Sequence, residues 1–171
     1  LHNSLPYNSG GYAARGHGLM CGVKAIGWDV QVITRRGYPH DRKGMSDLPT
    51  DDLQIVDEIP YHRLIELKRG YGQINIASYL QAYAEDLAEK VRELRPSILH
   101  AASNHINGLV VNAVAKHFNI PSIYEVRGLW EITRISRQPE FEGSEYFQMM
   151  SNLEANSASE ATYVFAITNA L

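Results

Sequence analysis

Apolar residues along the chain switch repeatedly between the spacing of a helix and the spacing of a strand. The clearest helix is predicted over about 74–94, where one stripe is apolar, the opposite stripe is charged, and Pro96 ends the segment. Further helices are predicted over 11–27, 109–118 and 141–158. The apolar stripe of the clearest helix consists of Ile76, Tyr79, Leu80, Tyr83, Leu87, Val91 and Leu94.

Short strands are predicted between these helices, with turn-forming residues near their ends. Strands that alternate with helices are typical of βαβ units, whose right-handed crossovers make the strands parallel. The sequence therefore predicts an α/β fold, a Rossmann-like three-layer sandwich with a mainly parallel sheet. The segment 37–52 is expected to be a loop, and 127–139 a loop or a broken helix. The predicted strands cover 30–33, 59–65, 97–100, 122–126 and 163–167.

The first predicted helix combines an apolar face with many small residues. The small residues suggest close packing on a sheet or close approach to a ligand, because glycine otherwise weakens a helix. His17 is expected at the surface, and Cys21 is expected to serve packing alone. The apolar face is predicted to consist of Tyr12, Leu19, Val23 and Ile26.

Composition narrows the class of protein. The 171 residues suffice for one domain with a real core, so a single domain over 1–171 is expected. A hydrophobic fraction of 44% and a charged fraction of 20% are ordinary for a soluble globular protein. The formal net charge of −3 argues against nucleic acid held by bulk electrostatics. One cysteine excludes an internal disulfide and a zinc site built on several thiolates.

Both ends of the sequence suggest a piece of a longer chain, natural or designed. There is no initiator Met, Leu1-His2 is typical of the end of a strand, and 168–171 is typical of the start of a helix. No signal-peptide pattern and no apolar run of bilayer length is visible. A cytoplasmic protein is therefore expected.

Ligands of open parallel sheets bind beyond the carboxyl ends of the strands, and the first such place here is the segment 3–11. It ends in Gly10-Gly11 and leads into a helix, whose N-terminus favours an anion such as a diphosphate by roughly 1–2 kcal/mol. The alternative is a turn that needs glycine for its geometry alone. The pattern is neither GxGxxG nor a Walker loop, which argues against a dinucleotide dehydrogenase and a kinase.

The second place is the segment 100–108, which is predicted to join a strand to a helix. His100, Asn104 and His105 can donate hydrogen bonds to sugar hydroxyls or to the charge that develops on a leaving group. The alternative is helix capping by Ser103, Asn104 or Asn107, with a satisfied and half-buried histidine.

The third place is the segment 124–131, where three charged residues follow or end a strand. Arg127 can bind a phosphate or a carboxylate with its guanidinium fork. The alternative is a structural salt bridge from Arg127 to Glu125 or Glu131. Trp130 can stack on a sugar or cover the core.

These segments together resemble the N-terminal domain of the family 4 glycosyltransferases. The opening HNSLPYNSGGYAAR, with its GGY turn, and the later GWDVQVITRRGYP are similar to the first blocks of that family. ILHAASN at 98–104 and IPSIYEVRGLWE at 120–131 are similar to later blocks, and 154–168 is similar to the stretch that leads to the second domain. The likeness spans essentially the whole chain in order.

The resemblance implies the acceptor-side half of a two-domain GT-B enzyme, retaining and metal-independent, with no cofactor besides its nucleotide-sugar donor. Gly10 and Gly11 would contact the donor diphosphate. The family's usual His-x-His has Ala102 at its second position here, so His100, Asn104 and His105 all stay candidates for contact with the donor sugar. The substrate-binding residues would include Ser9, Tyr12, Arg127 and Glu131.

The resemblance also implies that the domain gripping the donor lies outside this chain, and that the chain is inactive alone. The expected partners are that C-terminal domain, a nucleotide-sugar donor and a sugar or lipid-linked acceptor, with peripheral association at the inner face of a membrane. The alternatives are a non-catalytic Rossmann-like ligand-binding module and a sugar-nucleotide epimerase on the GT-B scaffold.

Overall fold

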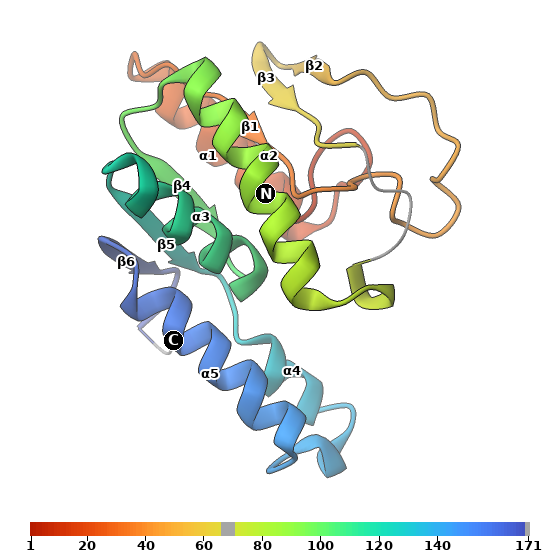
Figure 1. The fold of residues 1–171 in the computed structure, drawn as a ribbon. Helices are drawn as coiled ribbons and strands as arrows, with labels where there is room; N and C mark the ends of the chain where they lie inside the picture. Colours follow the sequence, from red (N-terminus) through yellow and green to blue (C-terminus); the bar gives the residue numbers. More distant parts are fainter. Residues whose placement is uncertain (66–70, 170–171) are drawn as a thin grey trace. The chain divides into compact units, whose positions relative to one another are not determined.

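The computed structural model describes residues 1–65 and 71–169, and helices alternate with strands along most of them (Figure 1). The chain forms two compact units, Leu1–Asp86 and Leu87–Leu171. The longest helix, α2 (Ile76–Leu94), belongs partly to each unit. Its apolar stripe is confirmed at Tyr79, Tyr83, Leu87 and Val91, which are all buried.

The first unit holds a small mixed sheet in the order β1-β3-β2. The strand β1 (Val32–Ile33) pairs parallel with β3 (Ile59–His62), and β2 (Leu53–Val56) pairs antiparallel with β3. Its apolar core is formed by Val32, Ile59 and Tyr61. The strand β2 was not predicted from the sequence. The remaining elements are α1 (Gly11–Ala25) and the short 3₁₀ helix η1 (Tyr71–Gln73).

The buried face of α1 differs from the predicted one. Tyr12 is 60% exposed and Ile26 is 75% exposed, whereas Ala13, Gly16 and His17 are buried. The prediction that His17 lies at the surface is therefore wrong. Its Nδ1 lies 2.8 Å from the Tyr61 hydroxyl and its Nε2 lies 2.9 Å from a carboxylate oxygen of Asp57. These polar partners explain why a histidine can occupy a core position.

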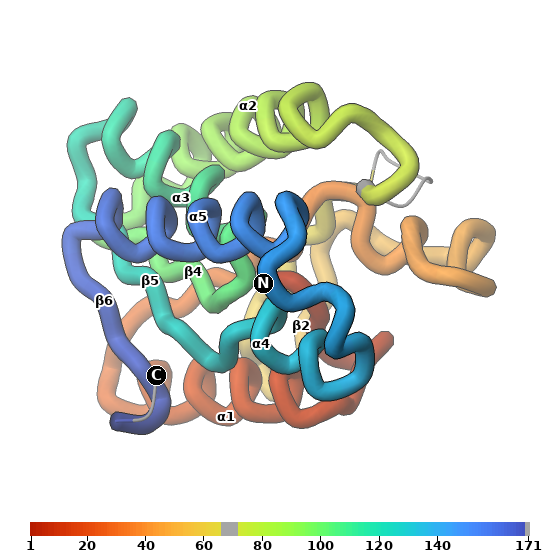
Figure 2. Tube along the Cα trace, turned by 90° about the horizontal axis from the view of Figure 1, so that it is seen from below, coloured from red at the N-terminus to blue at the C-terminus, as the bar shows by residue number. Residues whose placement is uncertain are grey.

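The second unit is built on a fully parallel sheet in the order β4-β5-β6. Figure 2 shows α3 and α5 lying side by side along this sheet, and the two helices are in contact. The chain order is typical of successive βαβ units. The elements are β4 (Leu99–Ala102), α3 (His105–Phe118), β5 (Ser122–Val126), α4 (Trp130–Ile135), the 3₁₀ helix η2 (Pro139–Phe141), α5 (Glu145–Ser159) and β6 (Tyr163–Ala166).

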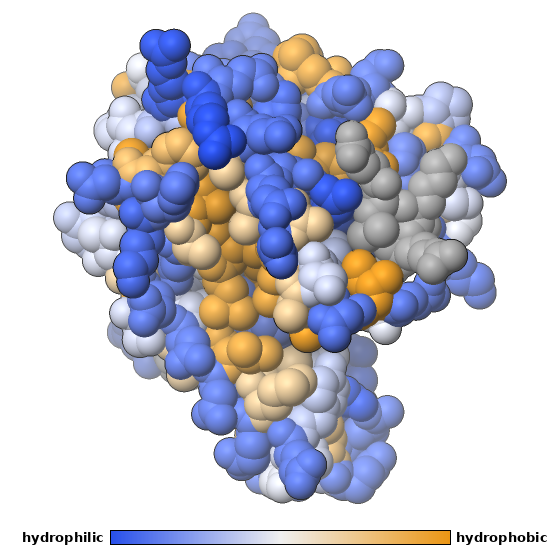
Figure 3. Space-filling model, in the orientation of Figure 1, coloured by the Kyte–Doolittle hydropathy of each residue, from blue (hydrophilic) through white to orange (hydrophobic). Residues whose placement is uncertain are grey.

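Glycine allows the close approach of α3 to its neighbours. A Cβ atom added at Gly108 would lie 2.6 Å from the Ser157 Cβ on α5 and 2.7 Å from a ring carbon of Tyr124 on β5. The Asn112 side chain strengthens the same contact by donating to the Ser157 carbonyl at 2.8 Å. Apolar side chains are also visible over the region of α3 in the space-filling view (Figure 3). The α3–α5 contact therefore combines close backbone approach with a buried hydrogen bond.

Most predicted elements of the second unit are present, with shifted ends. The predicted strand 122–126 coincides with β5, and the broken helix at 127–139 contains α4. The strand predicted to end at His100 continues to Ala102, so His100 lies within β4. The helix predicted from Phe141 begins at Glu145, where the Ser144 hydroxyl accepts the Phe147 N–H. The predicted helix start at 168–171 lies partly outside the described residues.

Candidate functional site

The Gly10-Gly11 turn lies at the N-terminus of α1, as predicted. Gly10 has extended backbone angles and Gly11 is the first helical residue. A Cβ added at Gly11 would meet no atom of the described residues within 4 Å, apart from its chain neighbours and the backbone of its own helix, and the φ of Gly11 is not in the left-handed region. Neither packing nor backbone angle therefore explains a glycine there, and the open space leaves room for a ligand. Ser9 and Tyr12 flank the turn and are both exposed.

The polar groups of this turn are only partly engaged. The Gly10 N–H donates to the Asn8 side-chain oxygen at 2.9 Å, so one amide is already satisfied within the loop. The Gly10 carbonyl accepts from the N–H groups of Ala13 and Ala14. No acidic residue lies in the first turn of α1, so the positive end of the helix dipole is not offset there. This end of α1 suits a negatively charged group.

An arginine that the sequence reasoning missed holds the segment before the turn. Arg63 follows β3 and donates from Nη1 to the Ser4 hydroxyl at 2.5 Å and from Nη2 to the Leu5 carbonyl at 2.6 Å. Its guanidinium also lies 5.4 Å from the ring centroid of Tyr7 and 4.9 Å from that of Tyr61. The only signal in the sequence is an arginine among aromatic residues, which does not reveal the distant partner Ser4.

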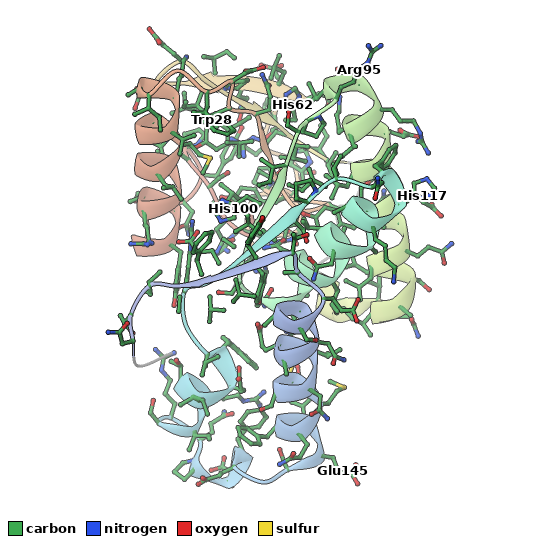
Figure 4. The ribbon with its side chains drawn as sticks, turned by 90° about the vertical axis from the view of Figure 1, so that its left-hand side faces the viewer. Trp28, His62, Arg95, His100, His117 and Glu145 are labelled. Carbon is green, nitrogen blue, oxygen red and sulfur yellow. The ribbon has the colours of Figure 1, made fainter. Side chains whose placement is uncertain are left out.

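In the second unit, His100, Glu125 and Arg127 form one polar cluster at the ends of β4 and β5. The His100 Nε2 lies 3.2 Å from a Glu125 carboxylate oxygen, and an Arg127 Nη2 donates to the same oxygen at 2.7 Å. Burial alone would raise the pKa of Glu125, but the hydrogen bonds from His100 and Arg127 outweigh it and lower that pKa to about 2. The predicted salt bridge from Arg127 to Glu125 is thus present. Figure 4 shows His100 on β4.

His105 belongs to a second and more deeply buried cluster around Glu154 of α5. One Glu154 oxygen accepts from the His105 backbone N–H at 2.8 Å and lies 3.1 Å from the His105 Nδ1, and the other accepts from the Tyr124 hydroxyl. Burial would raise the pKa of Glu154, yet the hydrogen bonds from His105 and Tyr124 leave it lowered. A carboxylate can only accept a hydrogen bond, so the His105 Nδ1 carries a proton and donates to Glu154. The His105 Nε2 takes no part in this contact.

The start of α3 is capped in a way that the sequence did not predict. Asn104 is the N-cap residue but its side chain makes no capping hydrogen bond. The Ser103 hydroxyl instead accepts from the Arg127 N–H at 3.1 Å, and the Asn107 amide donates to the Ala102 carbonyl at 3.0 Å. The Glu154 carboxylate satisfies the first N–H of the helix. The side-chain oxygen of Asn104 is left buried without a hydrogen-bond partner.

Glu131, in the first turn of α4, also carries an orphaned oxygen. The residue is 4% exposed, and its Oε2 has no hydrogen-bond partner among the described residues. Burial raises the pKa of Glu131, with a further contribution from the negative charge of Glu154. Buried acceptors without partners are rare, and a ligand hydroxyl is one group that can satisfy them. Trp130 beside it is 43% exposed and packs edge-on against Phe141, so it covers part of the core.

The predicted site residues therefore fall into two groups. Ser9, Gly10, Gly11 and Tyr12 lie in the first unit, at the start of α1. The second unit brings the others to the ends of β4 and β5 and the helices that follow, where Glu154 and Tyr124 join them. In the part of the chain that the structure describes, no three His, Cys, Asp or Glu side chains gather in a metal-binding arrangement. The members of the second group are His100, Asn104, His105, Arg127 and Glu131.

Parallel βαβ units with polar residues beyond the carboxyl ends of their strands define a Rossmann-like α/β protein. Residues 10–171 match the family model of the glycosyl transferase 4-like domain, and the chain belongs to that family. The resemblance seen in the sequence is thus confirmed. A comparison with curated protein sequences finds no match.

Among solved structures, the chain is similar to sucrose-phosphate synthase from Thermosynechococcus elongatus. The TM-score is 0.66 at 17% sequence identity, and the match covers 91% of this chain and 36% of that one. This likeness confirms the predicted fold class, an α/β fold like the Rossmann-like half of a GT-B protein. The chain spans about a third of the length of that synthase.

Proposed function

We propose that this chain is the N-terminal, acceptor-side half of a retaining and metal-independent glycosyltransferase. The enzyme transfers a sugar from a nucleotide-sugar donor to an acceptor such as a glycan or a lipid-linked sugar. A second domain grips most of the donor, and the chain alone does not turn over. Family membership supports the transferase class. The observation that carries the proposal is Gly11, a glycine at a helix N-terminus that nothing within the described chain requires.

In this proposal the donor diphosphate lies at the Gly10-Gly11 turn, beside Ser9 and Tyr12. The diphosphate accepts hydrogen bonds at the N-terminus of α1, and the helix dipole adds a favourable contribution. A side chain at position 11 would occupy the space of the ligand. The exposed Tyr12 and Ser9 then line the approach to the phosphates.

The second unit supplies the contacts to sugar hydroxyls. Asn104 is the first choice among the three predicted catalytic residues, because its side-chain oxygen is buried and has no partner. His105 contacts Glu154 and His100 contacts Glu125. These contacts restrict the orientation of both imidazole rings. Glu131 offers a second unpaired acceptor, and Arg127 keeps the Glu125 carboxylate charged. Preorganised polar groups of this kind stabilise developing charge without reorganisation.

The test is nucleotide release from a panel of nucleoside-diphosphate sugars, measured on the full-length gene product and on residues 1–171 in parallel, with and without EDTA. The proposal expects donor-dependent release by the full-length protein that EDTA does not change, and no release by residues 1–171. Release that EDTA abolishes would contradict metal independence. Binding of a donor without release would instead favour a ligand-binding module, and interconversion of the donor sugar would favour an epimerase.

A lipid-linked acceptor would place the protein at the inner face of the cytoplasmic membrane. Among the described residues no helix has the length and apolarity needed to cross a bilayer. Exposed apolar side chains that can contact lipid are available at the end of α1, at Ile26 and Trp28. Co-sedimentation with anionic vesicles tests this point, and loss of binding in Trp28→Ser is the expected result.

A further inference from the structure

Arg63 carries a buried positive charge that no carboxylate neutralises among the described residues. It is 3% exposed, and its guanidinium donates to the Ser4 hydroxyl, the Leu5 carbonyl and the Gln54 side-chain oxygen. All three are neutral. Buried charges in proteins are normally paired, because transfer from water is costly. A guanidinium held only by neutral groups therefore leaves positive potential around it.

Other guanidinium groups add to this potential beneath the segment 3–11. The charges of Arg63, Arg42 and Arg35 all act on the phenol of Tyr38, whose hydroxyl donates to the Ser4 carbonyl at 2.8 Å. Arg35 is paired with Asp41, whereas Arg42 donates to the neutral Asn3 side chain at 2.9 Å. Asp57, which acts on the neighbouring Tyr61, is shared with His17 and lies largely exposed. Of the groups named here, three guanidinium charges face the carboxylates of Asp41 and Asp57.

We propose that Arg63 is a positioning residue for a phosphate-bearing ligand at the Gly10-Gly11 turn. Its hydrogen bonds fix Ser4 and Leu5, which begin the loop that leads to the turn. Its charge favours an anion bound there, and the aromatic rings of Tyr7 and Tyr61 beside the guanidinium limit the screening of that field by water. The inference rests on the proposed function, because it takes the turn as the place of the phosphates. The phosphates belong to a nucleotide donor or to a phosphorylated acceptor.

Binding of inorganic pyrophosphate, measured by calorimetry on the full chain, tests the inference. Arg63→Gln is expected to weaken pyrophosphate binding at least tenfold, while the matched control Arg137→Gln, an exposed arginine of the second unit, stays within twofold of the wild type. Arg63→Lys keeps the charge and is expected to recover most of the affinity. Circular dichroism confirms that each variant is folded. A folded Arg63→Gln with wild-type affinity, or a wild type that does not bind pyrophosphate, overturns the inference.

A lysine variant as weak as the glutamine variant also overturns it, because the positive charge at position 63 would then contribute nothing to binding. If Arg63→Gln does not fold, Arg42→Gln removes a neighbouring and less buried charge and must weaken pyrophosphate binding as well. Competition separates the two sources of phosphate. If UDP displaces pyrophosphate, the site binds the phosphates of the donor. If only glucose 6-phosphate displaces it, the site binds the phosphate of the acceptor.

The role of Arg63 and the proposed transferase function can fail independently of each other. A wild type that binds pyrophosphate through Arg63 but uses no nucleotide sugar keeps this inference and removes the transferase assignment. A wild type that transfers sugar, with an unchanged donor KM in folded Arg63→Gln, keeps the transferase assignment and removes this inference.

Discussion

At the residue scale, Glu131 combines a buried carboxylate with an oxygen that has no hydrogen-bond partner. The pKa of Glu131 is raised, which means that the folded state disfavours the charged carboxylate. Ionisation of Glu131 therefore destabilises the folded protein at pH values above the folded pKa. We therefore predict that Glu131→Gln increases the free energy of unfolding at pH 7 by about 1 kcal/mol. The gain should vanish as the pH falls below the unfolded pKa of the carboxyl. Urea denaturation at both pH values measures it.

The control for this prediction is Glu142→Gln, which removes an exposed carboxylate of the same unit and should change stability by less than about 0.5 kcal/mol. A loss of stability in Glu131→Gln would mean that the Glu131 carboxylate is held by partners in solution. Sugar transfer should fall in the same variant if the unpaired oxygen accepts from a substrate hydroxyl.

Glu125 behaves in the opposite sense to Glu131. Its folded pKa of about 2 lies below the ordinary glutamate pKa of 4.5, so its contribution to stability is present above about pH 4.5 and is lost as the pH falls toward 2. The loss should be on the order of 3 kcal/mol, since one pKa unit corresponds to about 1.4 kcal/mol. Unfolding free energies of the wild type between pH 5 and pH 2.5 measure this slope. Glu125→Gln should be less stable at pH 7 and show a flatter slope, and an equally steep slope would refute the assignment.

At the element scale, the contact between α3 and α5 depends on Gly108. An alanine there would place its Cβ 2.6 Å from the Ser157 Cβ, and overpacking of this kind costs about 1–3 kcal/mol. Gly108→Ala is therefore expected to lower the melting temperature. Gly22→Ala in α1 is the matched control, because its Cβ would meet no atom within 4 Å and the helix should gain about 0.5–1 kcal/mol. Equal shifts in the two variants would contradict the packing described for α3.

The elements that the sequence predicted well are those whose local pattern agrees with their environment. The helix α2 has one apolar stripe, and β5 is a short strand that contains β-branched and aromatic residues and follows Pro121. The strand β2 was missed because its hairpin turn uses Asp57 and Glu58 at positive φ, where Asn-Gly is the usual signal. The buried face of α1 was predicted wrongly. The buried side of this helix consists of small residues and a histidine, while aromatic and aliphatic side chains stay exposed.

The candidate site was predictable only where it depends on strand ends. Parallel strands bring their carboxyl ends to one edge, which placed Asn104, His105 and Arg127 correctly relative to β4 and β5. The partners Glu154 and Arg63 were not predictable. Each acts on a residue that is 49 or 59 positions away in the sequence, and no local pattern encodes such a contact.

At the scale of the whole molecule, the family match and the fold define a glycosyltransferase domain. Its predicted site residues are divided between the two units, with the Gly10-Gly11 turn in one and the polar clusters in the other. The chain corresponds to 36% of sucrose-phosphate synthase, so the activity of a complete enzyme stays a proposal. That proposal depends most directly on the open space at Gly11.

The decisive measurement is the donor KM of the full-length gene product with Gly11→Val, compared with the wild type and with Gly18→Val. Both glycines are helical residues of α1 whose added Cβ meets no atom within 4 Å, so both variants should fold. We predict that Gly11→Val raises the donor KM at least tenfold, while Gly18→Val stays near the wild type. An unchanged KM in folded Gly11→Val would contradict the placement of the donor phosphates at this turn.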